Sequence, residues 1–318
     1  MKTLQVTEFG APTVLKCFDI PVPIPKDDEV LIKISAAGVN PVDAKTRRGI
    51  GFVAELIKDR MPWTLGYELS GVIEETGQGV NGFKKGDAVF GMVGLPKRSS
   101  CYAEYTTALP EELWFKPKNL SHTEAAGVPL AALTAWQGLF NVGNISKGDR
   151  ILIHAAAGGV GHFAVQFAKS TGAYVICTAS KHNESYLKDE LKADEVIDYS
   201  SVKFEDYVSD IDLVFDGVGG EVGIRSVKLL NENGLIIPLA TVSAQVVIDE
   251  AKKQKKNAKG MLVKADRGHL KEITRLIETG KVKVNIDQVY SLEDGYLSHA
   301  KIEEGHVRGK IVLLVGNR

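Results

Sequence analysis

The segment that begins at Arg150 constrains the fold most strongly, because it reads as a strand, a glycine-rich turn, a helix and a second strand. Apolar strands are expected over 150–155 and 173–178, with a helix over 159–171 between them. Small residues at the second and third positions of a G-x-G-x-x-G turn let backbone approach a pyrophosphate and let the helix pack closely on the strand. The alternative is a glycine turn with a purely structural role. We predict a dinucleotide-binding turn made of Ala156, Ala157, Gly158, Gly159, Val160 and Gly161.

The end of the second strand indicates which dinucleotide binds. An NAD-binding unit usually has Asp or Glu there, which accepts hydrogen bonds from the ribose 2′-hydroxyl. This chain continues with Ala179, Ser180 and Lys181, and no acid follows before Glu184. A hydroxyl and an ammonium suit a 2′-phosphate, so we predict NADPH as the cofactor, held by Ser180 and Lys181. The alternative for Lys181 is an ordinary surface lysine.

The pattern of apolar and turn residues in the rest of the chain changes near residue 119. Residues 1–118 carry short apolar runs between Gly and Pro, which are typical of an antiparallel β barrel or sandwich. Ser121 and Glu124 then form a capping-box pattern, and Pro129 should break or kink the helix that follows. Beyond it, solid apolar strands alternate with helices, which indicates a parallel sheet covered on both faces. Further strands are expected over 211–216, 234–239 and 260–264, and further helices over 183–192, 220–230, 243–258 and 267–280.

Charge and cysteine content exclude several classes of function. The net charge is −1, so bulk electrostatics do not favour nucleic acid or an anionic membrane as a partner. Cys17, Cys101 and Cys177 lie far apart, which fits a reducing compartment and supplies no zinc cluster. The start has no long apolar region typical of a signal peptide, and the richest apolar stretch, 235–248, is too short to span a bilayer. We therefore predict a soluble cytoplasmic protein.

Several stretches resemble one known family when they are taken in order along nearly the whole chain. They are "GYELSGVIEETGQGVNGFKKGDAVFG", "YAEY", "AAGVPLAALTAWQGL", "HAAAGGVG", "ADEVIDY", "DLVFDGVGG" and "HVRGKIVLL". Together they resemble the medium-chain dehydrogenase/reductase superfamily, in its zinc-free quinone oxidoreductase branch, which includes zeta-crystallin-like and enone reductases. The resemblance implies an α/β fold in which a Rossmann doubly wound parallel sheet, residues 119–285, is inserted into a GroES-like β-barrel domain made of residues 1–118 and 286–318. It also implies a homodimer, for which residues 259–265 offer an edge strand.

Two positions indicate whether this chain could bind the zinc ion of related dehydrogenases. Zinc dehydrogenases of the superfamily have a cysteine and a histidine where this chain has Asn40, in "GVN", and Tyr67, in "GYE". Asn and Tyr are poor replacements for thiolate and imidazole ligands. Without a Lewis acid, alcohol oxidation loses its main driving group. A quinone or an α,β-unsaturated carbonyl needs none, because conjugation places the arriving charge on oxygen, where nearby donors stabilise it.

The resemblance and the sheet topology nominate the remaining site residues. Asn40 would donate to the substrate oxygen, or is a turn residue before Pro41. Tyr67 would line the pocket or relay a proton, or is a core tyrosine. Lys310 resembles a basic residue that reaches the cofactor phosphate, or is a strand-start lysine. Thr134 resembles a family threonine that meets the nicotinamide. Loops that follow the strands of an open α/β sheet bind ligands. We therefore also predict cofactor contacts for the loop residues Tyr199, Val218, Leu239, Ala240 and Thr241.

Three functions stay open at this point. The first is an NADPH-dependent reductase of quinones or enones. The second is a trans-enoyl thioester reductase, for which the basic run 252–259 would attract a phosphate-bearing carrier, although a solvated helix face explains that run more simply. The third is an NADPH-binding protein with a structural or sensing role. The proton donor is also open, between Tyr67, a ribose hydroxyl and water.

Overall fold

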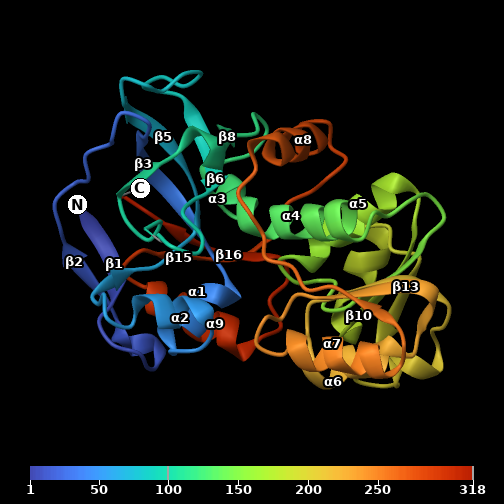
Figure 1. Cartoon of the computed structure of the whole chain (residues 1–318). Helices are drawn as coiled ribbons and strands as arrows, with labels where there is room; N and C mark the ends of the chain where they lie inside the picture. Colours follow the sequence, from blue (N-terminus) through green and yellow to red (C-terminus); the bar gives the residue numbers. More distant parts are fainter. Residues whose placement is uncertain (99, 317–318) are drawn as a thin grey trace. The chain divides into compact units, whose positions relative to one another are not determined.

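The computed structural model describes residues 1–98 and 100–316, which form two compact units (Figure 1). The first unit combines Met1–Leu133 with Lys264–Arg318, and the second is Thr134–Val263. The first unit therefore contains both ends of the described chain, and the second unit is an insertion within it.

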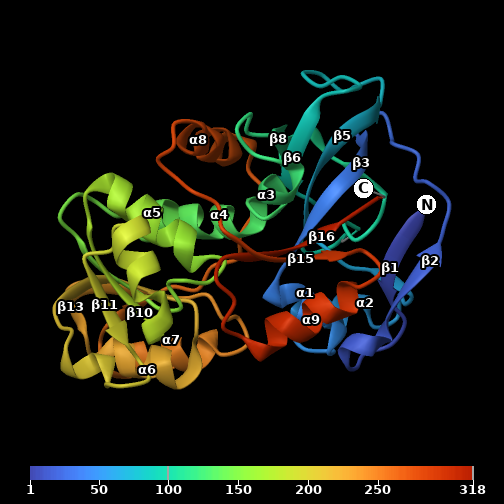
Figure 2. The ribbon, with the colours of Figure 1, turned by 180° about the vertical axis from the view of Figure 1, so that it is seen from behind.

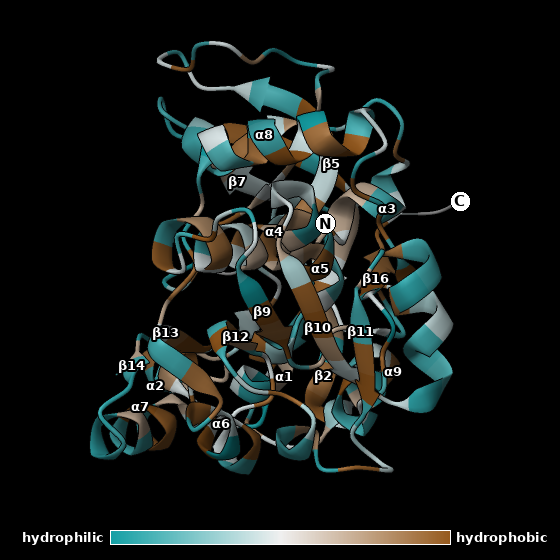
Figure 3. Ribbon diagram, turned by 90° about the vertical axis from the view of Figure 1, so that its right-hand side faces the viewer, coloured by the Kyte–Doolittle hydropathy of each residue, from teal (hydrophilic) through white to brown (hydrophobic). Residues whose placement is uncertain are grey.

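The second unit is built on a parallel sheet with the strand order β11-β10-β9-β12-β13-β14. Apolar side chains of β9, β10 and β12 are buried on both faces, among them Leu152, Ile176 and Val214 in one core cluster. Figure 3 shows this hydrophobic character along β10. In Figure 1, α5 lies on one side of the sheet and α6 and α7 lie on the other, so the doubly wound α/β prediction is confirmed. The strands are β9 (Arg150–Ile153), β10 (Tyr174–Ala179), β11 (Glu195–Asp198), β12 (Ile211–Asp216), β13 (Leu230–Pro238) and β14 (Asn257–Ala258), and the helices are α5 (Gly161–Thr171), α6 (Gly220–Val227) and α7 (Ala244–Lys253).

Two predicted elements of the second unit differ from the structure. The strand expected over 260–264 is wrong: β14 covers only 257–258 and the chain then runs on without regular structure. In the parallel register Ala258 faces Ile236, and β13 ends two residues later at Pro238, so residues 261–264 have no part of β13 beside them to pair with. The helix expected over 183–192 is present but begins and ends two residues earlier: residues 181–190 are helical throughout, with 3-10 geometry at Lys181–Asn183 and π geometry at Tyr186–Glu190.

The first unit is built on a mostly antiparallel sheet that the C-terminal strands complete, with β15 and β16 parallel to each other. Its order is β15-β16-β3-β5-β6-β8, with β7 also paired to β3. β16 pairs antiparallel with β3, so the expected return of the tail to the N-terminal domain is confirmed (Figure 2). The strands are β3 (Val30–Val39), β5 (Glu68–Thr76), β6 (Ala88–Met92), β7 (Tyr105–Ala108), β8 (Leu113–Phe115), β15 (Ile286–Ser291) and β16 (Lys310–Leu314), and a smaller sheet contains β1 (Lys2–Val6), β2 (Leu15–Asp19) and β4 (Trp63–Thr64).

Helices close the ends of this barrel-like unit. The capping box is confirmed, because Ser121 Oγ accepts the Glu124 N–H at 3.2 Å and the Glu124 carboxylate accepts the Ser121 N–H at 2.8 Å. Pro129 stands at the break between α3 and α4, as expected. The helices are α1 (Pro41–Arg47), α2 (Phe52–Ile57), α3 (His122–Ala126), α4 (Pro129–Trp136, which runs to the second unit), α8 (Arg267–Glu278) and α9 (Gly295–Glu304).

The bounds of the units differ from the predicted segment 119–285 at both ends. α3 packs on β3 and β5, and α8 packs on β8, so both helices belong to the first unit. The guanidinium of Arg267, the first residue of α8, lies 4.8 Å from the ring centre of Phe83 and 5.2 Å from that of Trp114. Cation–π contacts of this kind fasten the helix to strands that are far away in the sequence.

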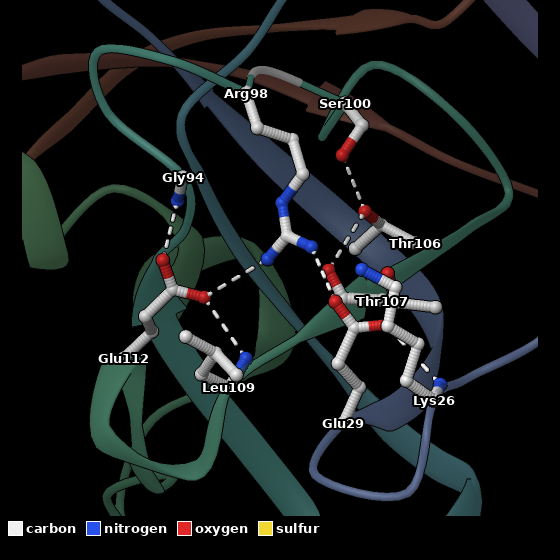
Figure 4. Close-up of polar contacts among 9 residues, drawn as sticks. All are labelled: Lys26, Glu29, Gly94, Arg98, Ser100, Thr106, Thr107, Leu109 and Glu112. Atoms are coloured by element: carbon white, nitrogen blue, oxygen red, sulfur yellow. Dashed lines mark hydrogen bonds and ion pairs between the residues drawn. The ribbon is translucent and has the colours of Figure 1, made fainter.

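An ion-pair network joins Arg98, which follows β6, to Glu29 and Glu112 (Figure 4). Arg98 donates to Glu29 at 2.6 Å and to Glu112 at 3.3 Å, and both carboxylates are largely buried. Glu112 also accepts the backbone N–H groups of Gly94 and Leu109. Every carboxylate oxygen in this network has a donor, so the network ties Arg98 firmly to the segments that carry Glu29 and Glu112.

Candidate functional site

The predicted glycine turn joins β9 to α5 in the second unit. Gly161 is the first residue of α5 and is buried against the turn. A Cβ added at Gly161 would lie 2.3 Å from the Ala155 oxygen and 2.7 Å from the Ala156 Cα, which are backbone atoms. Ala156 and Ala157 are buried, whereas Gly158, Gly159 and Val160 are partly exposed. The first N–H groups of a helix lack partners within the helix, so this turn presents backbone donors and the positive end of α5 to an anion.

Most other predicted cofactor residues lie at the same edge of the sheet. Parallel strands place all their carboxyl ends together, and the strand order reverses between β9 and β12, which is where open α/β sheets bind ligands. Ser180 and Lys181 follow β10, Tyr199 follows β11, and Val218 follows β12. Leu239, Ala240 and Thr241 follow β13. The structure therefore brings these residues to one edge, and their contacts with the cofactor stay a prediction.

The two residues predicted for the 2′-phosphate are accessible but already have partners. Lys181 is exposed and its ammonium forms an ion pair with Glu184. Glu184 also pairs with Lys188 at 2.8 Å, and the hydrogen bonds from these lysines lower the pKa of Glu184 to about 2. Ser180 Oγ lies 3.2 Å from His182 Nδ1. A phosphate at this position would take Lys181 from Glu184.

The histidines beside the glycine turn fit a packing role. His154 is buried and its ring nitrogens lie 2.8 Å from Thr178 Oγ1 and 2.8 Å from Ser226 Oγ. Burial lowers the pKa of His154 to about 3, so the ring stays neutral. Neutral imidazole between two hydroxyls ties β9 to β10 and to α6.

Asn40 lies in the first unit, directly after β3. The antiparallel register pairs Ala37 with Leu69 and Val39 with Ile311. The end of β3 therefore meets the starts of β5 and β16, which are Glu68 and Lys310. Asn40 is also the N-terminal cap of α1, with Pro41 at the first helical position. The turn role before Pro41 is thus present alongside the buried contacts described next.

A buried polar cluster joins these three strand ends. Asn40 Nδ2 donates to Glu68 Oε1 at 2.8 Å, and Lys310 Nζ donates to Asn40 Oδ1. Lys310 Nζ also lies 2.7 Å from Glu68 Oε1 and 3.0 Å from the Val39 oxygen. Glu68 Oε2 accepts the Leu130 N–H at the start of α4, at 2.7 Å. We call Asn40, Glu68 and Lys310 the amide cluster; its side chains are at most 3 % exposed.

A second buried carboxylate holds the backbone beside both predicted catalytic residues. Asp43 accepts the Asn40 N–H at 2.9 Å and the N–H of Gly66, the residue before Tyr67, at 3.2 Å. Burial raises the pKa of Asp43 to about 7, against the opposite effect of its hydrogen bonds with Asn40 and Tyr102. The Tyr102 hydroxyl lies 3.4 Å from Nε2 of the buried His299.

The remaining predicted residues have clear places. Tyr67 is fully buried in the first unit, and its carbonyl accepts the Val93 N–H. Thr134 is half-buried on α4. Lys310, predicted for a cofactor phosphate, directs its ammonium to the amide cluster. The roles of all three toward ligands stay predictions.

Sequence reasoning missed Glu68 and Asp43. Glu68 follows Tyr67 and opens an apolar strand, and Asp43 stands three residues after Asn40 in a capping pattern. Glu68 could have been identified from the sequence, because it is a carboxylate at the start of a strand expected to be buried, and a buried charge needs partners.

The described residues do not provide a set of side chains suited to binding a metal ion. No group of three or more His, Cys, Asp or Glu side chains in residues 1–98 and 100–316 has an arrangement that could hold a metal ion. Asn40 and Tyr67 are poor zinc ligands, and Lys310 places a cation on Glu68 Oε1. The described cysteines are free thiols. No helix among the described residues is both long and apolar enough to cross a membrane.

Comparison with known proteins places both units. Residues 26–118 match the family model of the alcohol dehydrogenase GroES-like domain, and residues 191–313 match that of zinc-binding dehydrogenases. The chain is 35% identical to 2-methylene-furan-3-one reductase of Solanum lycopersicum, across 98% of this chain and 79% of the relative. It is 33% identical to a chloroplastic NADPH-dependent alkenal/one oxidoreductase of Arabidopsis thaliana, with the same coverage.

A solved structure matches even more closely. The quinone oxidoreductase from Coxiella burnetii is 42% identical to this chain, and superposes with a TM-score of 0.96 over 99% of both chains.

Proposed function

Because the chain belongs to the quinone and enone oxidoreductases of the medium-chain dehydrogenase/reductase superfamily, we propose that it is an NADPH-dependent reductase of a quinone or an α,β-unsaturated carbonyl. When bound, NADPH supplies the hydride. The residues of this chain bind the two reactants, orient them and stabilise the charge that reaches the carbonyl oxygen.

The second unit would hold the cofactor. In the turn Ala156–Gly161 the N–H groups of Ala156 and Gly158 donate to the Thr178 and Ala155 carbonyls, so the other N–H groups of the turn would bind the pyrophosphate. Ser180 and Lys181 would bind the 2′-phosphate. Gly161 supports this fit, because its missing Cβ leaves α5 packed directly on the backbone of the turn. The loops after β11, β12 and β13 complete the same edge of the sheet.

The first unit would stabilise the acceptor. The observation that carries the proposal is the orientation of the Asn40 amide, whose Nδ2 is a donor held in place by Glu68. Nδ2 carries two hydrogens and Glu68 accepts one, so the other can donate to a carbonyl oxygen. A fixed donor aimed at developing negative charge needs no Lewis acid, which is why we propose a metal-independent reaction.

A panel of acceptors tests this function. NADPH oxidation would be followed with a quinone, a short enone and a crotonyl thioester. We expect turnover with the quinone or the enone. Turnover with the thioester alone would favour an enoyl thioester reductase, and cofactor binding without turnover on any of them would favour a structural or sensing role.

The basic run 252–259, proposed to attract a thioester carrier, is partly used by the fold. Its Lys256 donates to the carbonyls of Leu230 and Asn231.

The preference for NADPH should depend on Lys181. Replacing Lys181 with alanine is expected to weaken NADPH binding about tenfold and to leave NADH binding nearly unchanged, as measured by titrating both cofactors. Lys188→Ala is the matched control, because Lys188 is exposed and pairs with the same Glu184. Equal affinity of the unmodified protein for NADH and NADPH would contradict the assignment.

We propose that the chain forms a homodimer through the β14 edge of the second unit. Leu262 and Val246 expose 45% and 50% of their surface near this edge, and a two-residue edge strand leaves backbone groups available for pairing. Sedimentation at micromolar concentration should give a dimer, and Leu262→Glu should give a monomer. A monomeric unmodified protein would contradict the proposal.

We also propose a cytoplasmic location, which the free thiols of the described cysteines support.

A further inference from the structure

We propose that Glu68 and Lys310 act as positioning residues, which fix the Asn40 amide in one orientation and polarise it as a donor. This inference rests on the proposed function, because it assigns to Asn40 the bond to the acceptor oxygen. It gives Lys310 a role within the first unit, different from the phosphate contact that the sequence predicts.

The orientation follows from what each group is able to do. An amide side chain has a carbonyl that accepts and an NH₂ that donates, and it can turn over if its neighbours allow both. Lys310 can only donate and an ionised Glu68 can only accept. With Lys310 on Oδ1 and Glu68 on Nδ2, the reversed amide would face donor with donor and acceptor with acceptor. The ion pair therefore permits a single orientation.

The same contacts make Nδ2 a stronger donor. A cation bonded to the amide oxygen draws electron density from the nitrogen, and hydrogen bonds in series strengthen one another in a low-dielectric interior. The ammonium is fully occupied, because its three hydrogens have the Val39 oxygen, Asn40 Oδ1 and Glu68 Oε1 as acceptors. It acts on a ligand through Asn40.

Two glycines make room for the ion pair. A Cβ at Gly38 would lie 2.2 Å from Glu68 Oε1 and 2.5 Å from the Ala126 oxygen. A Cβ at Gly127 would lie 3.1 Å from Lys310 Cβ. Both side chains thus run close to backbone that carries no side chain of its own.

The test uses isosteric or neutral changes and compares kcat with cofactor affinity. Glu68→Gln keeps the shape but removes the negative charge that holds Asn40 Nδ2 and pairs with Lys310, so the amide is held from its oxygen side alone and loses its fixed position. We expect kcat with the accepted quinone or enone to fall about ten- to a hundredfold, with the NADPH dissociation constant changed less than about threefold. Glu75→Gln, an exposed change on the same strand, is the control and should leave kcat unchanged.

Lys310→Met leaves a buried carboxylate unpaired and can impair folding. The double variant Glu68→Gln/Lys310→Met removes both charges, so its thermal unfolding separates stability from catalysis. In a background of Asn40→Ala, neither change should lower kcat further, because the residue they position is absent.

The outcomes separate this inference from the proposed function. If Asn40→Ala lowers kcat while Glu68→Gln and the double variant do not, the positioning role is wrong and the function stands. If Asn40→Ala itself leaves kcat unchanged, the proposed acceptor site is wrong. If the double variant weakens NADPH binding tenfold or more and spares kcat, Lys310 binds the cofactor and the inference fails.

Discussion

Replacing Asn40 with alanine is expected to lower kcat about 10²–10³-fold, with little change in NADPH affinity. Removal of one donor from an oxyanion site costs roughly 2.7–4 kcal/mol of transition-state stabilisation, and alanine offers no substitute. Because alanine has no amide, Glu68 and Lys310 keep only each other, Val39 and Leu130 as partners. Steady-state kinetics with the quinone or enone identified by the acceptor panel would measure the effect.

The control for this variant must account for stability. Asn40 stands at the start of α1 and its side chain partners the buried Glu68 and Lys310, so its loss can also lower stability and unfolding is measured in parallel. Asn81→Ala changes an exposed asparagine of the first unit and should leave kcat unaltered. A folded Asn40→Ala protein whose kcat is within twofold of the unmodified enzyme would show that the amide is not the acceptor's donor.

Gly161→Ala is expected to damage cofactor binding and stability together. The new methyl group would lie 2.3 Å from the Ala155 oxygen, so either α5 or the turn must move. Overpacking of this kind costs about 1–3 kcal/mol, and we expect a value near the upper end because the clashing atoms are backbone. The displaced turn should weaken NADPH binding at least about tenfold, measured by titration alongside thermal unfolding.

Gly268→Ala provides the comparison. Gly268 lies in the first turn of α8, where an added Cβ would meet only the side-chain atom Asp266 Oδ1, at 3.2 Å, and alanine favours the helix. Its NADPH affinity and melting temperature should match those of the unmodified protein. A Gly161→Ala variant that binds NADPH normally would mean that the close packing of α5 is not required by the cofactor turn.

Local patterns in the sequence predicted the features that depend on neighbouring residues. The turn from Ala156 to Gly161 and the capping box at Ser121 both follow from chemistry within six residues. The return of the tail to the first domain was expected from the family resemblance, and its pairing with β3 is shown by the structure. Two short helices, α1 and α2, were missed in a region that was expected to hold strands only. The Asn40–Pro41 pair is a helix-start signal, but the alternatives considered for Asn40 were a donor to the substrate and a turn residue.

Features that depend on strand register could not be predicted from the sequence. Glu68 and Lys310 are brought together only because β5 and β16 both lie beside β3. The membership of α8 in the first unit depends on Arg267 reaching Phe83 and Trp114, and no local pattern encodes that contact. The strand expected over 260–264 failed because apolar content predicts burial or pairing but does not supply the partner strand.

Turnover of chelator-treated protein tests the central claim most directly, because the account assigns the reaction to NADPH and a polarised amide with no metal. The protein would be dialysed exhaustively against a chelator, its residual metal quantified, and NADPH oxidation measured with the quinone and the enone. We predict that kcat stays within twofold of the untreated value at a metal content far below one ion per chain. Loss of turnover on chelation, with recovery when zinc is restored, would contradict the account.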